Sequence, residues 1–181
     1  RKELDGVLTI PFLGNIPRHG SKKGEDSDGI VVRENGRDSV SEAFRIIRTN
    51  MDFMRVKSDK LQVVMFTSAN PGAGKTFVSS NLAMSIAQTN KKVVLVDVDI
   101  RKGTLSGIFS NSSNRMGLTH YLSGSTDKVD DIVGTSEEYE KLDVIFSGPV
   151  PPNPAELLLS ERFDRLITEL RKRYDYIIVD N

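Results

Sequence analysis

One short stretch of the chain reads Ser68-Ala69-Asn70-Pro71-Gly72-Ala73-Gly74-Lys75-Thr76. The apolar run 62–68 leads into it and predicts a strand, and apolar residues at helical spacing follow it. The glycines let main-chain N–H groups turn inward around an anion, and the start of a helix adds its positive dipole end. A strand, a glycine-rich turn and a helix that opens on Lys75 and Thr76 together predict a phosphate-binding loop.

The residue types of this loop suit the phosphates of a nucleotide. We expect the Lys75 ammonium to bridge the β- and γ-phosphates and the Thr76 hydroxyl to coordinate magnesium. The general pattern has a glycine at the position of Ala69, and the turn at 71–72 can replace it. A plain glycine turn does not explain the lysine and threonine. A dinucleotide-binding turn would need Gly or Ala where Phe77 stands.

Apolar strands alternate with helices along the rest of the chain. The expected strands cover residues 62–68, 92–98, 142–147 and 174–179, and the expected helices cover residues 75–89 and 154–173. Strands that are apolar on both faces and alternate with helices predict an α/β fold, with a mostly parallel sheet flanked by helices on both faces. Residues 103–139 are polar and predict short helices and loops.

Three acidic residues stand at the ends of predicted strands. Asp97 and Asp99 end the second strand, and Asp180 follows the last one. Strand side chains alternate, so Asp97 and Asp99 are expected to point the same way at the carboxyl edge of the sheet, where parallel sheets bind ligands. Buried carboxylates need a cation or strong donors, which magnesium beside a nucleotide supplies. The alternative is one helix cap and one solvated acid.

The composition excludes several kinds of protein. With 181 residues the chain predicts one domain, and 25 basic residues against 25 acidic ones leave no excess charge for nonspecific nucleic-acid binding. The absence of cysteine excludes disulfides, thiolate catalysis and Cys-ligated zinc. His19 and His120 lie far apart in polar surroundings and are predicted to be surface residues, not metal ligands or bases.

The predicted domain has three parts, residues 1–38, 39–58 and 61–181. The first part holds a flexible loop from residue 18 to residue 29, and the last is the nucleotide-binding core. Ser39 and Glu42 have the spacing of a capping box, so a helix is expected from Val40. No apolar run is long enough to span a membrane. Because the chain opens without a methionine and stops on a core strand, we expect a domain whose last elements are missing.

These motifs together resemble the bacterial tyrosine kinases (BY-kinases), over nearly the whole chain. Residues 71–76 look like the family's first nucleotide motif, residues 95–103 like its carboxylate motif, and residues 177–180 like its magnesium-site strand. Residues 42–48 are similar to its Glu-x-x-Arg-x-x-Arg helix, and residues 12–17 and 151–158 also look familial. Asn181 departs from the Thr or Ser that commonly follows the magnesium-site acid, and the tyrosine-rich tail is absent.

The resemblance implies a P-loop NTPase-like fold, incomplete at its C-terminal end, that binds ATP and Mg²⁺. It implies transfer of the γ-phosphoryl group to a tyrosine, with Asp97 accepting the hydroxyl proton and Lys75 neutralising the phosphates. From spacing alone, Asp97 and Asp99 are exchangeable. The implied nucleotide-binding residues are Pro71, Gly72, Ala73, Gly74, Lys75, Thr76, Phe77 and Arg101. The implied magnesium site consists of Thr76 directly and of Asp99 and Asp180 through water.

The resemblance also implies partners and a location. The helix with Glu42, Arg45 and Arg48 would join copies into a ring-like homo-oligomer, whereas spacing alone predicts a solvated helix face. A membrane-spanning chain-length regulator region, in cis or in trans, would place this soluble fragment at the cytoplasmic face of the bacterial inner membrane. The implied process is capsular or extracellular polysaccharide synthesis and export, with no nucleic acid involved.

Two other functions stay open at this stage. The first is an ATP-dependent oligomeric switch or scaffold without tyrosine transfer. The second is a positioning or partition ATPase, which shares the fold. That class carries a signature lysine at the position of Asn70, and an asparagine cannot reach a neighbouring active site as a cation.

Overall fold

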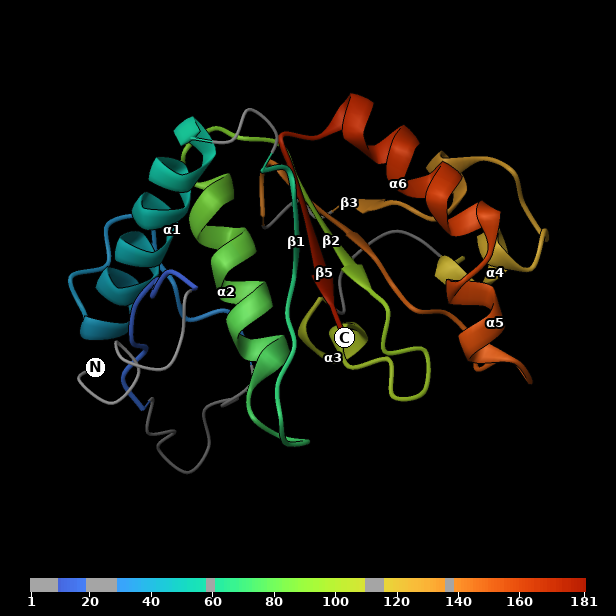
Figure 1. Ribbon diagram of the computed structural model, residues 1–181, viewed down its shortest axis with the longest axis horizontal. Helices are drawn as coiled ribbons and strands as arrows, with labels where there is room; N and C mark the ends of the chain where they lie inside the picture. The colour runs from blue at the N-terminus through green and yellow to red at the C-terminus, as the bar shows by residue number, and fades with distance from the viewer. Residues whose placement is uncertain (1–9, 19–28, 58–60, 110–115, 136–138) are drawn as a thin grey trace.

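The computed structural model of the chain describes residues 10–18, 29–57, 61–109, 116–135 and 139–181 (Figure 1). The predicted flexible loop lies almost wholly outside these residues, as does His19. The helices are α1 (Ser39–Lys57), α2 (Lys75–Ala87), α3 (Leu105–Ile108), α4 (Leu118–Leu122), the 3-10 helix η1 (Val129–Asp131), α5 (Pro154–Leu158) and α6 (Glu161–Arg173). The strands are β1 (Val63–Met65), β2 (Val93–Asp97), β3 (Gly134–Thr135), β4 (Leu142–Ile145) and β5 (Tyr176–Asp180).

The five strands form one sheet in the order β1-β5-β2-β4-β3. The first four are parallel, and β3 runs antiparallel beside β4 at the edge. Helices α1 and α2 lie on one side of this sheet, and α4, α5 and α6 lie on the other (Figure 1). The predicted α/β fold with a mostly parallel, doubly covered sheet is confirmed.

The central strands β2 and β5 are apolar up to their last residue because each face packs into a separate core. In β2, Val93 and Leu95 belong to the core beneath α1 and α2, whereas Val94 and Val96 belong to the core beneath α4 and α6. All four side chains are fully buried. Strand alternation therefore places the next residue, Asp97, on the side covered by α2.

The predicted helix over residues 154–173 is wrong in one respect, because the chain forms two helices there. Ser160 has extended backbone angles, and its hydroxyl donates to the main-chain oxygen of Leu157 at 2.6 Å. This contact closes the last turn of α5 and lets α6 begin in a new direction. Leu159 at the break is 87% exposed. The two-residue strand β3 was not predicted, since so short a segment carries no alternation.

The predicted capping box at the start of α1 is also wrong. The cap is Asp38, whose carboxylate accepts from the N–H groups of Val40 at 3.1 Å and Ser41 at 2.9 Å, and from the Ser41 hydroxyl at 2.7 Å. Glu42 turns outward and pairs with Arg45 instead. Asp and Ser are both good caps, and the tertiary structure selected the earlier residue.

Within the described part of the chain, no helix is long and apolar enough to cross a membrane.

Candidate nucleotide-binding site

The loop between β1 and α2 has the backbone that an anion site needs. Gly72 has φ of 72° and Gly74 has φ of 87°, in the left-handed region that favours glycine. A Cβ atom at either position would meet no atom within 4 Å, so backbone conformation and not crowding requires the glycines. The predicted loop geometry is present, and it opens directly onto the first turn of α2.

Two polar side chains at the start of α2 contact neighbouring loops. The Lys75 ammonium lies 3.2 Å from the hydroxyl of Ser68, so the lysine bends back across the loop. The Thr76 hydroxyl lies 3.2 Å from the hydroxyl of Thr104, in the segment that follows β2. The first N–H groups of a helix have no partners within the helix, which makes this turn a site for an anion.

Two adjacent cavities meet at this loop. One, of about 510 Å³, is lined by residues 67–72, by residues 98–102 and by α5. The other, of about 780 Å³, is lined by residues 72–77, by Gly29 and Ile30 and by residues around α3. The residues that line both cavities are Gly72, Lys75, Asp99, Lys102 and Asn181.

All eight predicted nucleotide-binding residues line one or both of these cavities. Arg101 lines the smaller cavity, and Thr76 and Phe77 line the larger one. Asp97 lines neither of the two. The structure thus brings the predicted loop, Arg101 and Asp99 together around one space.

Asp97 and Asp180 lie side by side under the start of α2. They are paired residues in the register of β2 and β5, and both are almost completely buried. One Asp97 oxygen accepts from the N–H of Asp99 at 3.1 Å, and the other accepts from the N–H of Leu105 at 3.4 Å. Burial raises the pKa of Asp97 to about 7, helped by the nearby Asp180 charge.

The prediction that strand alternation makes Asp97 and Asp99 point the same way is wrong in its premise. Strand β2 ends at Asp97, and the chain then turns, with the N–H of Gly103 donating to the Asp99 main-chain oxygen at 2.9 Å. Alternation therefore does not continue to Asp99, which is partly exposed. Asp97 is enclosed beneath the turn and Asp99 faces the cavities.

The Asp180 carboxylate is held on one side only. Its Oδ1 atom accepts from the Ser79 hydroxyl at 3.0 Å, while its Oδ2 atom is buried and has no hydrogen-bond partner among the described residues. Burial raises the pKa of Asp180, although the nearby hydroxyl groups of Thr76 and Ser79 and the charge of Lys75 act in the opposite direction. An unpaired buried carboxylate oxygen is costly, and a hydrated cation would satisfy it.

The donor set suits magnesium held partly through water. Among the described residues, no three acidic or histidine side chains are close enough to hold a metal ion by themselves. One hydroxyl, from Thr76, and the unpaired Asp180 oxygen remain as oxygen ligands, which Mg²⁺ prefers along with several waters. Thr76 and Asp180 of the predicted set fit this description, and Asp99, which lines both cavities, stays a prediction.

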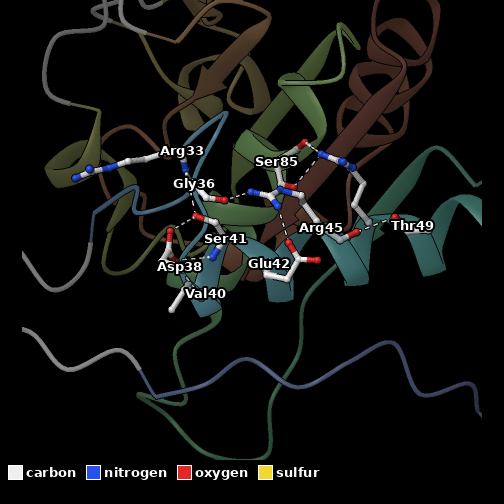
Figure 2. A network of polar contacts seen from close by, with 10 residues as sticks. Arg33, Gly36, Asp38, Val40, Ser41, Glu42, Arg45, Thr49 and Ser85 are labelled. Carbon is white, nitrogen blue, oxygen red and sulfur yellow. Dashed lines mark hydrogen bonds and ion pairs between the residues drawn. The ribbon is translucent and has the colours of Figure 1, made fainter.

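The three predicted oligomerisation residues on α1 do not form one free polar face. Arg45 pairs with Glu42 and also donates to the main-chain oxygen of Gly36 (Figure 2). Arg48 crosses to α2 and donates to the main-chain oxygen of Ser85 and, at 3.3 Å, to its hydroxyl. The prediction of a simple solvated face is therefore wrong for Arg48, because helix packing draws it inward.

The solvent side of α1 carries apolar residues that sequence spacing did not single out. Ile46 is 49% exposed and Phe53 is 66% exposed. Together with Glu42 and Thr49, they follow one another at helical spacing on the outer face.

His120 is a half-buried structural residue, which agrees in part with its prediction. Its Nδ1 atom accepts from the N–H of Gly117 at 3.0 Å.

Sequence reasoning missed Ser79 and Thr104, which contact Asp180 and Thr76. Nothing in the sequence marks either one, because their partners come from distant segments.

Comparison with known proteins agrees with this geometry. The chain is 40% identical over 171 residues to the tyrosine-protein kinase etk of Escherichia coli K12, covering 93% of this chain and 22% of that protein. It is 42% identical over 141 residues to the tyrosine-protein kinase CpsD of Streptococcus pneumoniae, covering 78% and 60%. The chain belongs to the bacterial tyrosine kinase family. Residues 61–181 also match the family described as AAA domain.

A solved structure of similar sequence shares this fold. The crystal structure of the chimerical protein CapA2B2 is 36% identical, with a TM-score of 0.83, covering 99% of this chain and 74% of that one. The chain spans about a fifth of the length of the Escherichia coli relative and about 60% of the streptococcal one. It therefore corresponds to a part of these BY-kinases.

Proposed function

We propose that this chain is the catalytic core of a protein-tyrosine kinase that uses ATP and Mg²⁺. The observation that carries the proposal is the meeting of the glycine loop, Lys75 and two buried carboxylates, Asp97 and Asp180, at one end of the sheet. A phosphate-binding loop alone serves many enzymes. Kinship with tyrosine kinases over nearly the whole chain selects among them.

The residues of the loop would position the nucleotide. Main-chain N–H groups of residues 71–76 and the Lys75 ammonium would bind the phosphates, and Phe77 and Arg101 would line the sides of the site. Thr76 would hold Mg²⁺ directly, and Asp99 and Asp180 would hold it through water. The metal ion supplies charge neutralisation when bound. Phosphoryl transfer depends mainly on such positioning and charge neutralisation.

The transfer step needs one proton acceptor. The tyrosine oxygen forms a bond to the γ-phosphorus, the bond to the β,γ-bridging oxygen breaks, ADP leaves and the hydroxyl proton passes to the enzyme. We assign this proton to Asp97, whose pKa of about 7 suits an acceptor near neutral pH. Because both of its oxygens accept main-chain N–H groups, the tyrosine reaches it only when residues 99–105 move.

The neighbouring copy of the chain would present the acceptor tyrosine. We propose a ring-like homo-oligomer that uses α1, with Glu42 and Arg45 at its surface and Arg48 joining α1 to α2 beneath. The exposed Ile46 and Phe53 add apolar area to this face, which supports a contact between copies.

Regulation of capsular or extracellular polysaccharide synthesis and export is the proposed process. The domain would act at the cytoplasmic face of the bacterial inner membrane, beside a membrane-spanning chain-length regulator region in the same or another chain. The support is the family kinship and a third relative, from Klebsiella pneumoniae, that is named for the cps region.

Lys75→Met tests the proposal in the full-length protein. The lysine head faces the loop and not the core, so the fold should persist while the phosphates lose their cation. We expect tyrosine labelling from ATP to fall at least about a hundredfold. The matched control is Lys91→Met, which removes an exposed lysine and should label like the parent.

Equal labelling in Lys75→Met and the parent would show that the loop assignment is wrong. Nucleotide binding and hydrolysis by the parent without any tyrosine labelling would favour the switch or scaffold instead.

A further inference from the structure

Ser79 occupies an unusual position one turn into α2. Its side chain is fully buried, and its hydroxyl lies 3.1 Å from the main-chain oxygen of Thr76 and 3.0 Å from Oδ1 of Asp180. A serine inside a helix ordinarily bonds back to a carbonyl of the preceding turn. The second acceptor, Asp180, lies on a strand 101 residues further along the chain, and this contact satisfies no backbone group of the helix.

The neighbouring residue shows what a helix serine does without such a partner. Ser80 is equally buried, and within the described part of the chain its hydroxyl has no hydrogen-bond partner. The two serines share a helix, a residue type and a degree of burial. They differ in that Ser79 contacts Asp180 and Ser80 does not. Burial in this helix therefore does not by itself account for the contact between Ser79 and the carboxylate.

The contact determines which Asp180 oxygen is available. Oδ1 is occupied by Ser79, and the buried Oδ2 is left without a partner. A carboxylate held at one oxygen cannot rotate freely, so its second oxygen has a defined direction. The partners that orient metal-binding carboxylates control metal affinity in the same way.

We propose that Ser79 is a positioning residue that orients Asp180 toward hydrated Mg²⁺ at the nucleotide site. The inference rests on the proposed function, since it requires that the loop binds a nucleotide with magnesium. Ser79 lines neither of the two cavities at the loop. It acts through Asp180 and, through its second contact, on the main chain at Thr76.

Binding of ADP at varied Mg²⁺ concentration tests this role in the full-length protein, by calorimetry or by thermal shift. We expect Ser79→Ala to raise the Mg²⁺ concentration needed for half-maximal ADP binding about tenfold. Affinity for ADP in EDTA should stay within about twofold of the parent, because the loop is untouched. Ser80→Ala, the matched control, should leave both quantities unchanged. Ser79→Thr keeps the hydroxyl and should restore most of the Mg²⁺ dependence.

A double variant separates positioning from a general packing defect. If Ser79 acts through Asp180, Ser79→Ala should add no further shift to that of Asp180→Asn. Equal Mg²⁺ midpoints in Ser79→Ala and Ser80→Ala would overturn the inference, as would additive effects in the double variant. If the parent does not bind ADP with Mg²⁺, the proposed function fails and this inference fails with it. A binding parent with an unshifted Ser79→Ala overturns the inference alone.

Discussion

The buried carboxyl of Asp97 should make the stability of this domain depend on pH near neutrality. Burial raises its pKa from 3.8 to about 7. The folded state therefore keeps this proton to higher pH than the unfolded chain does. As pH rises between these two values the unfolded state is increasingly favoured, so the free energy of unfolding falls. From about pH 5 to about pH 8, the linkage relation predicts a loss of about 2.5 kcal/mol from this group.

Asp97→Asn removes the titration while keeping the shape of the side chain. The amide oxygen can still accept one N–H, from Asp99 or Leu105, but the NH₂ group cannot accept the other. We expect that mismatch to cost about 1 to 2 kcal/mol at every pH. The curve of unfolding free energy against pH should thus start lower for the variant and lack the fall of about 2.5 kcal/mol.

Urea unfolding in EDTA at four pH values measures both curves. Far-UV circular dichroism is the signal, because the chain has no tryptophan. Asp99→Asn is the control, since it retains Asp97 and should retain nearly the whole fall. Parallel curves for the parent and Asp97→Asn would refute the argument, because Asp97 would then hold no proton in this range. The proposed proton acceptor would lose its support at the same time.

Three further predictions concern packing and assembly. Arg48→Ala removes the link from α1 to Ser85 and should lower the free energy of unfolding by about 1 to 3 kcal/mol. Urea titrations measure this change. The control, Glu42→Ala, alters an exposed residue and should lower the free energy of unfolding by less than about 0.5 kcal/mol. Changing Glu42 and Arg45 to Ala should reduce the fraction of oligomer that sedimentation of the full-length protein detects, with the free energy of unfolding nearly unchanged. An unaltered fraction of oligomer would count against this face of α1 as the contact between copies. Gly117→Ala drives a Cβ to 2.5 Å from a backbone nitrogen and should lower the melting temperature by several degrees, whereas Gly107→Ala, with open space around it, should not.

Much of the fold was predictable because its signals are local. A strand buried on both faces must be largely apolar, and β2 and β5 are apolar up to the aspartate that ends each of them. The loop at 68–76 needs glycine at positive φ and a lysine at the helix start, and neither depends on distant residues. Local sequence signals did not predict the structure where two neighbouring residues suit the same role or where packing decides. Asp38 and Ser39 both suit a helix cap, and the break at Ser160 depends on how α5 and α6 pack.

The residue order by itself determined the phosphate loop, the alternation of strands and helices, and the acidic ends of two strands. Tertiary structure alone decided that β5 lies between β1 and β2, which brings Asp180 beside Asp97 and under α2. It also decided that Asp97 is enclosed while Asp99 faces the cavities, that Ser79 but not Ser80 contacts a carboxylate, and that Arg48 points inward. The physical reason is that burial and hydrogen-bond partners depend on segments far apart in the chain, which periodicity and spacing do not record.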